Sequence, residues 1–198
     1  MKSKKSAFSL VELLVTLAIV ILLMGALVGV FIASNDTWKR NQKELDKQQL
    51  ARGPLNIIVN DLRKTSSDWV VDGTHYAVVI DVDGTQIDYY LPEFDSSNAI
   101  TQLKGARVYL VTTGDVNHLY RKVGTESAQI IGSYLDISSS SKPYFQFATT
   151  DNNVVQVKIS IVKEESRVFE LSTKVFLRNG SNDLSGVIVE PVQEEGES

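Results

Sequence analysis

The sequence of 198 residues contains no cysteine and only two histidines. The absence of cysteine excludes disulfide bonds and thiol chemistry. It does not assign a compartment, because an exported domain can also fold without disulfides. His75 and His118 stand far apart in segments with strand-like patterning, and no nucleophile motif, phosphate-binding loop or zinc-ligand spacing accompanies them. The composition therefore favours a protein that is not an enzyme, with no catalytic residues, no metal site and no cofactor.

A cluster of positive charge of the kind that binds nucleic acids is also lacking. The chain has 20 basic and 24 acidic residues and a formal net charge of −4. The one local excess of positive charge is formed by Lys2, Lys4 and Lys5 at the N-terminus. We therefore expect no direct nucleic-acid site.

Polar residues are nearly absent from the stretch that follows these lysines. In residues 13–33 only Thr16 is clearly polar, and a helix of this length spans about 30 Å, one bilayer core. Because the lysines precede the run, we expect the N-terminus to stay in the cytoplasm and the C-terminal part to be exported. A secretory signal peptide would have a shorter apolar core and a cleavage site marked by small residues. A plain signal anchor fits the length and the charge, but it leaves Glu12 unexplained.

The stretch "A-FSLVE-LLVTLAIVILL" resembles the type IV prepilin signature. It has a small residue, Phe, a polar residue, two aliphatic residues, Glu and then a long aliphatic run. In that family an inner-membrane peptidase cuts before the Phe and methylates the new N-terminus. The resemblance therefore implies cleavage between Ala7 and Phe8 and N-methylation of Phe8, with the apolar helix retained. The family usually has Gly where this chain has Ala7.

The resemblance also gives Glu12 a role in assembly. A carboxylate in lipid costs a few kcal/mol. In a filament, Glu12 of one subunit can face the positively charged Phe8 amine of the next. At about 4 Å and an effective dielectric constant near 20, such a pair contributes roughly 4 kcal/mol before desolvation. The alternative is a carboxylate that merely reaches the lipid headgroups.

Two glycines on the apolar helix offer a second contact. Gly25 and Gly29 stand four residues apart, and small residues at this spacing let transmembrane helices approach closely. The same spacing also arises by chance in apolar helices. Both interpretations stay open at the level of the sequence.

After Ala33 the composition becomes polar and rich in helix formers. Four apolar residues recur there with the spacing i, i+3, i+4 and i+7, namely Leu55, Ile58, Val59 and Leu62. This spacing predicts an amphipathic helix, which we expect to end near Ser66. Because Pro54 cannot donate to the carbonyl of Leu50, the sequence predicts a kink or a short break at Gly53–Pro54.

From Tyr76 onward the apolar residues alternate with a period of two, which predicts strands. We expect three hairpins, over residues 75–91, 106–124 and 154–177. The first turns at Asp83–Gly84, which explains these residues and Asp81 better than a calcium loop does. Residues 178–186 are then expected to end the sheet, and the acidic C-terminus is expected to be a disordered tail.

These patterns divide the chain into a leader, two helical parts, a sheet domain and a tail. The predicted boundaries are 1–7, 8–33, 34–66, 67–189 and 190–198. The expected fold is α+β, with a long N-terminal helix packed on an antiparallel β-sheet, as in pilins. The segments "LNIIVNDLRKT" and "LSTKVFLRN" resemble J-type minor pilins of type II secretion and related type IV minor pilins.

The resemblance implies a minor pilin or pseudopilin that joins a type IV pilus-like filament serving adhesion, motility, DNA uptake or protein secretion. Its partners would be other pilin or pseudopilin subunits, the prepilin peptidase and an inner-membrane assembly platform. The protein would cross the cytoplasmic membrane once and become extracellular on assembly. The competing hypothesis is a membrane-anchored binding module that does not polymerise.

Overall fold

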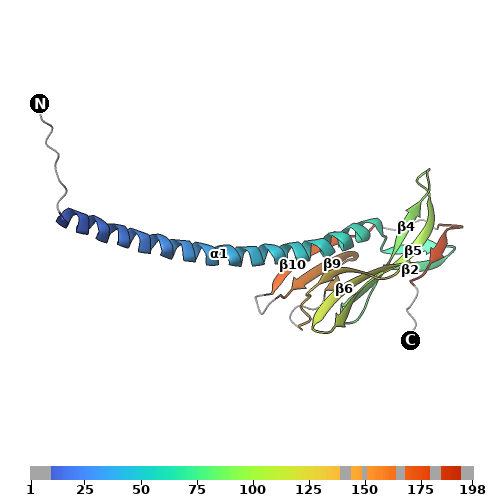
Figure 1. Ribbon diagram of the computed structural model, residues 1–198. Helices are drawn as coiled ribbons and strands as arrows, with labels where there is room; N and C mark the ends of the chain where they lie inside the picture. Colours follow the sequence, from blue (N-terminus) through green and yellow to red (C-terminus); the bar gives the residue numbers. More distant parts are fainter. Residues whose placement is uncertain (1–9, 139–143, 149–150, 164–167, 179–183, 193–198) are drawn as a thin grey trace, which may run out of the picture. The chain divides into compact units, whose positions relative to one another are not determined.

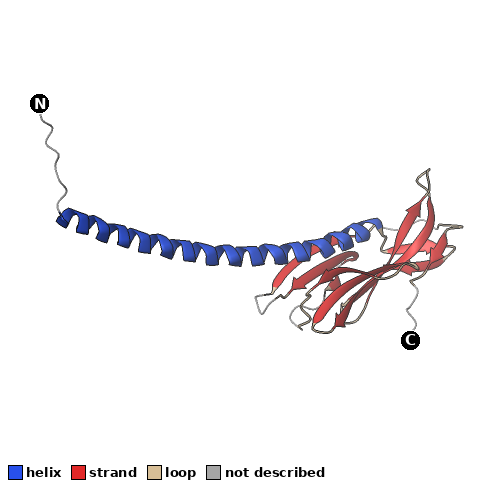
Figure 2. Ribbon diagram, viewed as in Figure 1, coloured by secondary structure: helices blue, strands red, loops and turns tan. Residues whose placement is uncertain are grey.

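The fold consists of one long helix followed by β-strands (Figures 1 and 2). The computed structural model describes residues 10–138, 144–148, 151–163, 168–178 and 184–192. The chain forms two compact units, Met1–Leu45 and Asp46–Ser198. The α+β, pilin-like arrangement that the sequence predicts is confirmed.

Helix α1 (Leu10–Lys64) is continuous through Gly53 and Pro54, so the short break is wrong, and the kink, the other predicted outcome, stays a prediction. Pro54 is buried, and its ring packs against Gly132 of strand β7 (Gln129–Ser133). A Cβ atom added to Gly132 would stand 2.6 Å from Cγ of Pro54. Tertiary packing of the ring therefore offsets the missing backbone hydrogen bond, a balance that local propensity does not describe.

The buried face of α1 lies entirely within residues 47–62. Its members are Lys47, Ala51, Pro54, Leu55, Ile58, Asp61 and Leu62. The predicted apolar stripe is confirmed, because Leu55, Ile58 and Leu62 join the main core and Val59 packs against it. Each fully buried leucine or isoleucine stabilises the fold by about 1.5–3 kcal/mol relative to exposure.

The strands form three sheets. The largest has the order β3 (Val79–Ile80), β4 (Gln86–Phe94), β5 (Ile100–Thr113), β6 (Val116–Val123), β7, with β11 (Ile188–Glu190) beside β5. The second has the order β10 (Phe169–Phe176), β9 (Asp151–Ile161), β8 (Phe145–Ala148), and the third consists of β1 (Asp68–Val71) and β2 (Thr74–Ala77). The pairings are antiparallel, except that β11 runs parallel to β5.

The three predicted hairpins are present as β3–β4, β5–β6 and β9–β10. In the first, the N–H of Gly84 donates to the carbonyl of Asp81 over 3.0 Å, and Gly84 takes the positive φ of 64° that favours glycine. Its predicted first strand is only partly right, because residues 74–77 pair with β1 instead. In the third, the connection at residues 164–167 lies outside the described residues.

Four strands were not predicted from the sequence, namely β1, β7, β8 and β11. Strand β1 pairs with β2 across a turn at Asp72–Gly73. The predicted end of the sheet at residues 178–186 is wrong, because β11 follows it. Strand β11 has three residues and pairs in parallel, so it carries almost no periodic signal. Gly105 leaves room for this segment, since a Cβ atom there would stand 2.6 Å from the backbone nitrogen of Val192.

The two larger sheets meet at two places and share one core. Leu135, after β7, forms an isolated bridge with Ile161 of β9. Elsewhere the carbonyl of Gly84 accepts hydrogen bonds from the backbone N–H groups of Tyr144 and Phe145 over 2.9 and 3.0 Å. Figure 1 shows the C-terminal part of α1 beside β9 and β10. The helix thus contributes its apolar face to a core that the two sheets enclose.

A polar cluster within this core links α1 to two strands. The hydroxyl of Tyr89 on β4 and the Nε–H of Arg121 on β6 both donate to Asp61 Oδ2, over 2.8 and 2.6 Å. The Asp61 side chain is 8% exposed and that of Arg121 is 23% exposed. Removing one partner of a buried ion pair costs about 3–5 kcal/mol, so this cluster favours one rotation of the helix against the sheet.

We predict that a fragment starting at Ser34 folds without detergent. The reason is that every described residue of α1 before Lys47 is exposed, so the core takes no side chain from residues 10–33. The fragment should unfold in one cooperative transition, with the near-UV circular dichroism of the full chain in micelles. Aggregation of every fragment that lacks the first 33 residues would contradict this.

We also predict that stability falls above about pH 10, the ordinary pKa of tyrosine. Burial, followed by the charge of Asp61, raises the pKa of Tyr89 well above that value. The unfolded chain therefore loses this proton first, and the contribution of Tyr89 to stability is lost as the pH rises toward its folded pKa. Denaturant unfolding of Tyr89→Phe at pH 7 and pH 11 should show a smaller alkaline loss than the natural chain. Tyr120→Phe removes a hydroxyl from a tyrosine of the same sheet and is the control for the substitution itself.

Candidate assembly segment

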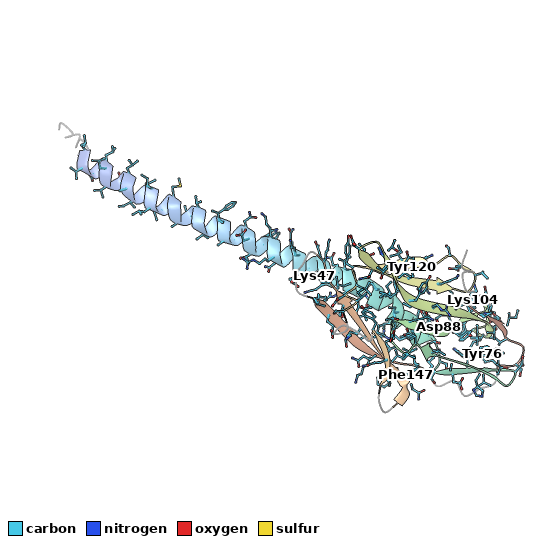
Figure 3. The ribbon with its side chains drawn as sticks, turned by 90° about the horizontal axis from the view of Figure 1, so that it is seen from below. Lys47, Tyr76, Asp88, Lys104, Tyr120 and Phe147 are labelled. Carbon is cyan, nitrogen blue, oxygen red and sulfur yellow. The ribbon has the colours of Figure 1, made fainter. Side chains whose placement is uncertain are left out.

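The candidate functional segment is the apolar part of α1. Every described residue from Leu10 to Ala33 is exposed, and Figure 3 shows side chains projecting from all sides of this part of the helix. By length and composition the helix can cross a membrane. An apolar surface of this extent is costly in water, so the segment is suited to lipid or to neighbouring helices.

The one clearly polar residue within residues 13–33 is satisfied inside the helix. The hydroxyl of Thr16 donates to the carbonyl of Leu13 over 2.9 Å. Thr37 makes the same kind of bond, to the carbonyl of Ala33, also over 2.9 Å. Thr16 therefore presents no unmet donor to an apolar environment.

Glu12 is the only charged residue in residues 10–33 and lies in the first turn of α1. Its side chain is exposed. The first basic residue of α1 is Lys39, about 40 Å further along at 1.5 Å per residue. No cation on α1 itself can therefore neutralise Glu12. The residues predicted to be processed, Ala7 and Phe8, lie outside the described residues, so the proposed partner of Glu12 stays a prediction.

Gly25 and Gly29 lie on one face of α1, one helical turn apart. A Cβ atom added at either glycine would meet no described atom within 4 Å. Packing within the described chain therefore gives no reason for glycine at these positions. Their role as a close contact for another helix stays a prediction.

The two histidines lie in strands, as predicted, His75 in β2 and His118 in β6. Nδ1 of His75 stands 2.6 Å from Asp68 Oδ2, and Nδ1 of His118 stands 2.9 Å from Ser133 Oγ. Within the described ranges, no group of three or more His, Asp or Glu side chains could hold a metal ion.

The Asp81 carboxylate serves the first hairpin turn. It accepts hydrogen bonds from the backbone N–H groups of Thr85 and Gln86 and from the Thr85 hydroxyl, over 2.6, 2.9 and 2.8 Å. An aspartate that accepts hydrogen bonds from its own turn is a common turn-forming device. The interpretation of Asp81 and Gly84 as parts of a tight hairpin is thus confirmed.

Sequence reasoning missed two polar groupings, Asp61 with Tyr89 and Arg121, and Asp68 with His75. The first left a signal, because Asp61 stands three residues after Ile58 and one before Leu62, next to the apolar stripe. A charge at such a position needs a buried partner. The second grouping left no signal in the sequence, since Asp68 and His75 meet only through the pairing of β1 with β2.

Comparison with known proteins adds one finding. The family model described as the prokaryotic N-terminal methylation motif matches residues 2–28. Neither the curated proteins nor the solved structures give a match. The motif and the fold support the class of type IV pilin-like proteins, and thus a structural subunit rather than an enzyme. Together with the apolar helix, the motif also supports a single membrane anchor.

Proposed function

We propose that this protein is a minor pilin or pseudopilin that is processed at its N-terminus and assembled into a type IV pilus-like filament. The observation that carries the proposal is the methylation motif at residues 2–28, on a helix that continues without a break into the core of a β-sheet unit. The apolar end is suited to anchoring and assembly, and the sheet unit is the part exported. In this proposal the N-terminus stays in the cytoplasm.

The proposed assembly contact is between Glu12 and the Phe8 amine of a neighbouring subunit. Cleavage after Ala7 would create this amine four residues before Glu12. An unpaired charge in lipid is less stable than a paired one. Helix α1 carries no cation within about 40 Å of Glu12. Pairing with a neighbouring subunit therefore lowers the free-energy cost of the carboxylate in lipid, which the single helix cannot do. Gly25 and Gly29 would let the helices of such neighbours approach closely.

The domain boundaries follow the same proposal. Residues 1–7 are the leader, 8–33 the membrane and assembly segment, 34–66 the amphipathic helix, 67–189 the sheet domain and 190–198 the tail. The partners are other pilin subunits, the prepilin peptidase and an inner-membrane assembly platform. The resemblance of residues 55–65 and 171–179 to J-type and related minor pilins favours a minor subunit, of a secretion system or of a pilus.

The first test is the chemistry of the N-terminus. Mass spectrometry of the protein from its native membrane should find a chain that begins at Phe8, with a methyl group on its amine. Loss of Lys2, Lys4 and Lys5 lowers the formal charge of −4 by three, which isoelectric focusing also detects. A mature protein that keeps Met1 to Ala7 would refute the proposal and favour the anchored binding module.

The second test is the role of Glu12. Glu12→Gln keeps the shape and removes the charge, whereas Glu12→Leu also removes the cost of insertion into lipid. Both variants should be processed and should reach the membrane in normal amounts. Both should enter filaments poorly, because the Phe8 amine of the neighbour loses its partner. The quantity to measure is the amount of each variant in sheared filaments relative to its amount in the membrane.

The matched control is Asp36→Asn, which removes a carboxylate from the same helix outside the apolar segment. It should enter filaments as the natural chain does. A normal ratio for both Glu12 variants would show that Glu12 is not an assembly contact. An equal loss in all three variants would assign the effect to the net charge of the helix rather than to Glu12.

A further inference from the structure

A cleft in the sheet unit lies between the β1–β2 hairpin and the β8–β9 pair. It has a volume of about 380 Å³, within the range of small-ligand sites. Polar groups of its lining come from Ser67, Asp68, His75 and Asn153, and apolar ones from Ala77, Val78 and Phe147. All of these residues belong to the sheet unit, and none takes part in the proposed assembly contact.

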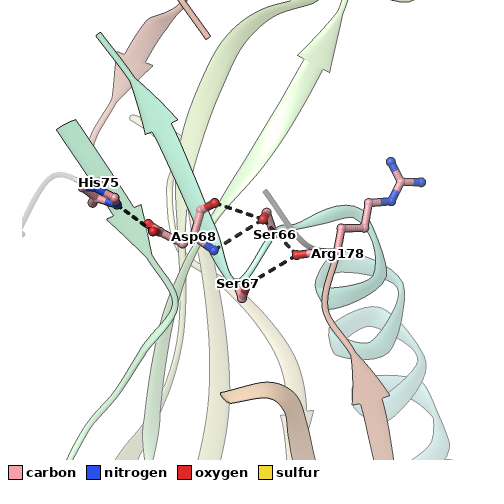
Figure 4. Close-up of polar contacts among 5 residues, drawn as sticks. All are labelled: Ser66, Ser67, Asp68, His75 and Arg178. Carbon is pink, nitrogen blue, oxygen red and sulfur yellow. Dashed lines mark hydrogen bonds and ion pairs between the residues drawn. The ribbon is translucent and has the colours of Figure 1, made fainter. Parts of the chain in front are cut away.

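Asp68 is the distinctive group of this cleft (Figure 4). Its Oδ2 atom stands 2.6 Å from Nδ1 of His75. Its Oδ1 atom is buried and accepts no hydrogen bond from the described part of the chain. A carboxylate oxygen that is removed from water without a donor is costly. The torsion that carries an aspartate carboxylate is broad, so a small rotation can bring Oδ1 to a donor in the cleft.

The charges of the lining residues determine which charge the ligand that carries this donor should have. Asp68 and His75 are its only ionisable residues. The site is therefore negative when the imidazole is neutral, and neutral when the imidazole is protonated. Arg178 is close by, but only its backbone carbonyl takes part, accepting hydrogen bonds from Ser66 and Ser67. Figure 4 shows its guanidinium directed away from Asp68, so the protein supplies no cation of its own from this residue.

We propose that this cleft binds an alkylguanidinium or alkylammonium group. The cationic head would donate to Asp68 Oδ1, with the Ser67 hydroxyl as a second acceptor. The alkyl stem would pack on the apolar side, against Ala77, Val78 and Phe147. A charge-assisted hydrogen bond to a carboxylate is about twice as strong as a neutral one, which favours a cation over a neutral donor. Such a group can be a soluble amine or an Arg or Lys side chain of a neighbouring copy.

The two histidines provide the measurement. The full chain, labelled with ¹³C at Cε1 of histidine and held in micelles, gives signals from His75 and His118 only. His75 is in the cleft and its side chain is 68% exposed, whereas His118 is on β6 and serves as the internal control. The probe is n-butylguanidinium, and n-butylurea is its uncharged counterpart of the same shape.

We expect n-butylguanidinium to shift the His75 signal saturably and to leave the His118 signal unchanged. n-Butylurea should bind at least about tenfold more weakly, since it donates to the same carboxylate without a positive charge, and a hydrogen bond between two ionised groups is the stronger one. Asp68→Asn, which keeps the shape of the side chain, should weaken n-butylguanidinium binding by a similar factor. Ala77→Phe fills the cleft from an exposed position and should abolish the shift without touching the carboxylate.

Three results would overturn the proposal: no shift of His75 in the natural chain, an equal shift with n-butylurea, or an unchanged affinity in Ala77→Phe. Unchanged His118 signals in both variants show that the fold is intact. The protein is also measured without added ligand at increasing protein concentration. If the His75 signal then moves in the direction that n-butylguanidinium causes, the bound group is a side chain of a neighbouring copy. A signal independent of concentration identifies a soluble cation. Neither the ligand titration nor the concentration series depends on filament assembly.

Discussion

The rest of the structure depends on one constraint, that a single helix must satisfy two environments. Between Leu10 and Ala33 all sides of α1 are exposed and apolar, so this part needs lipid or other helices around it. Between Lys47 and Leu62 one face is buried in the core of the sheet unit. The helix is continuous between the two parts, so no irregular linker separates the apolar segment from the buried face.

Polar groups are placed differently in the two environments. In the apolar part, Thr16 is satisfied by its own helix, and Glu12 is left as a charge that its own helix does not neutralise. In the sheet unit, Asp61 lies almost fully buried and accepts hydrogen bonds from both Tyr89 and Arg121. A buried charge with two donors fixes a geometry, whereas an unpaired charge in lipid favours association. Asp61 therefore stabilises the sheet unit, whereas the role of Glu12 in joining subunits belongs to the proposed function.

The sheets are completed by segments that are distant in the sequence. The carbonyl of Val70 in β1 accepts a hydrogen bond from the N–H of Leu184 over 2.8 Å, and β11 pairs with β5 a few residues later. Trp69, Val71 and Leu103 form a second small core, against which residues of this C-terminal segment pack. The β1–β2 hairpin, one wall of the cleft at Asp68, is therefore held by the end of the chain as well as by its own turn.

The sequence by itself determined the features that depend on local pattern: the apolar run, the position of Glu12, the stripe at residues 55–62 and the three main hairpins. Each follows from a period or a turn that neighbouring residues specify. Only the tertiary structure decided that α1 continues through Pro54, because the ring packs where Gly132 has no side chain. It also decided that β11 pairs with β5, that Asp61 meets Arg121 and that Asp68 meets His75. These contacts join residues whose proximity depends on how the sheets and the helix pack, and packing energy is a property of the whole fold rather than of any short segment.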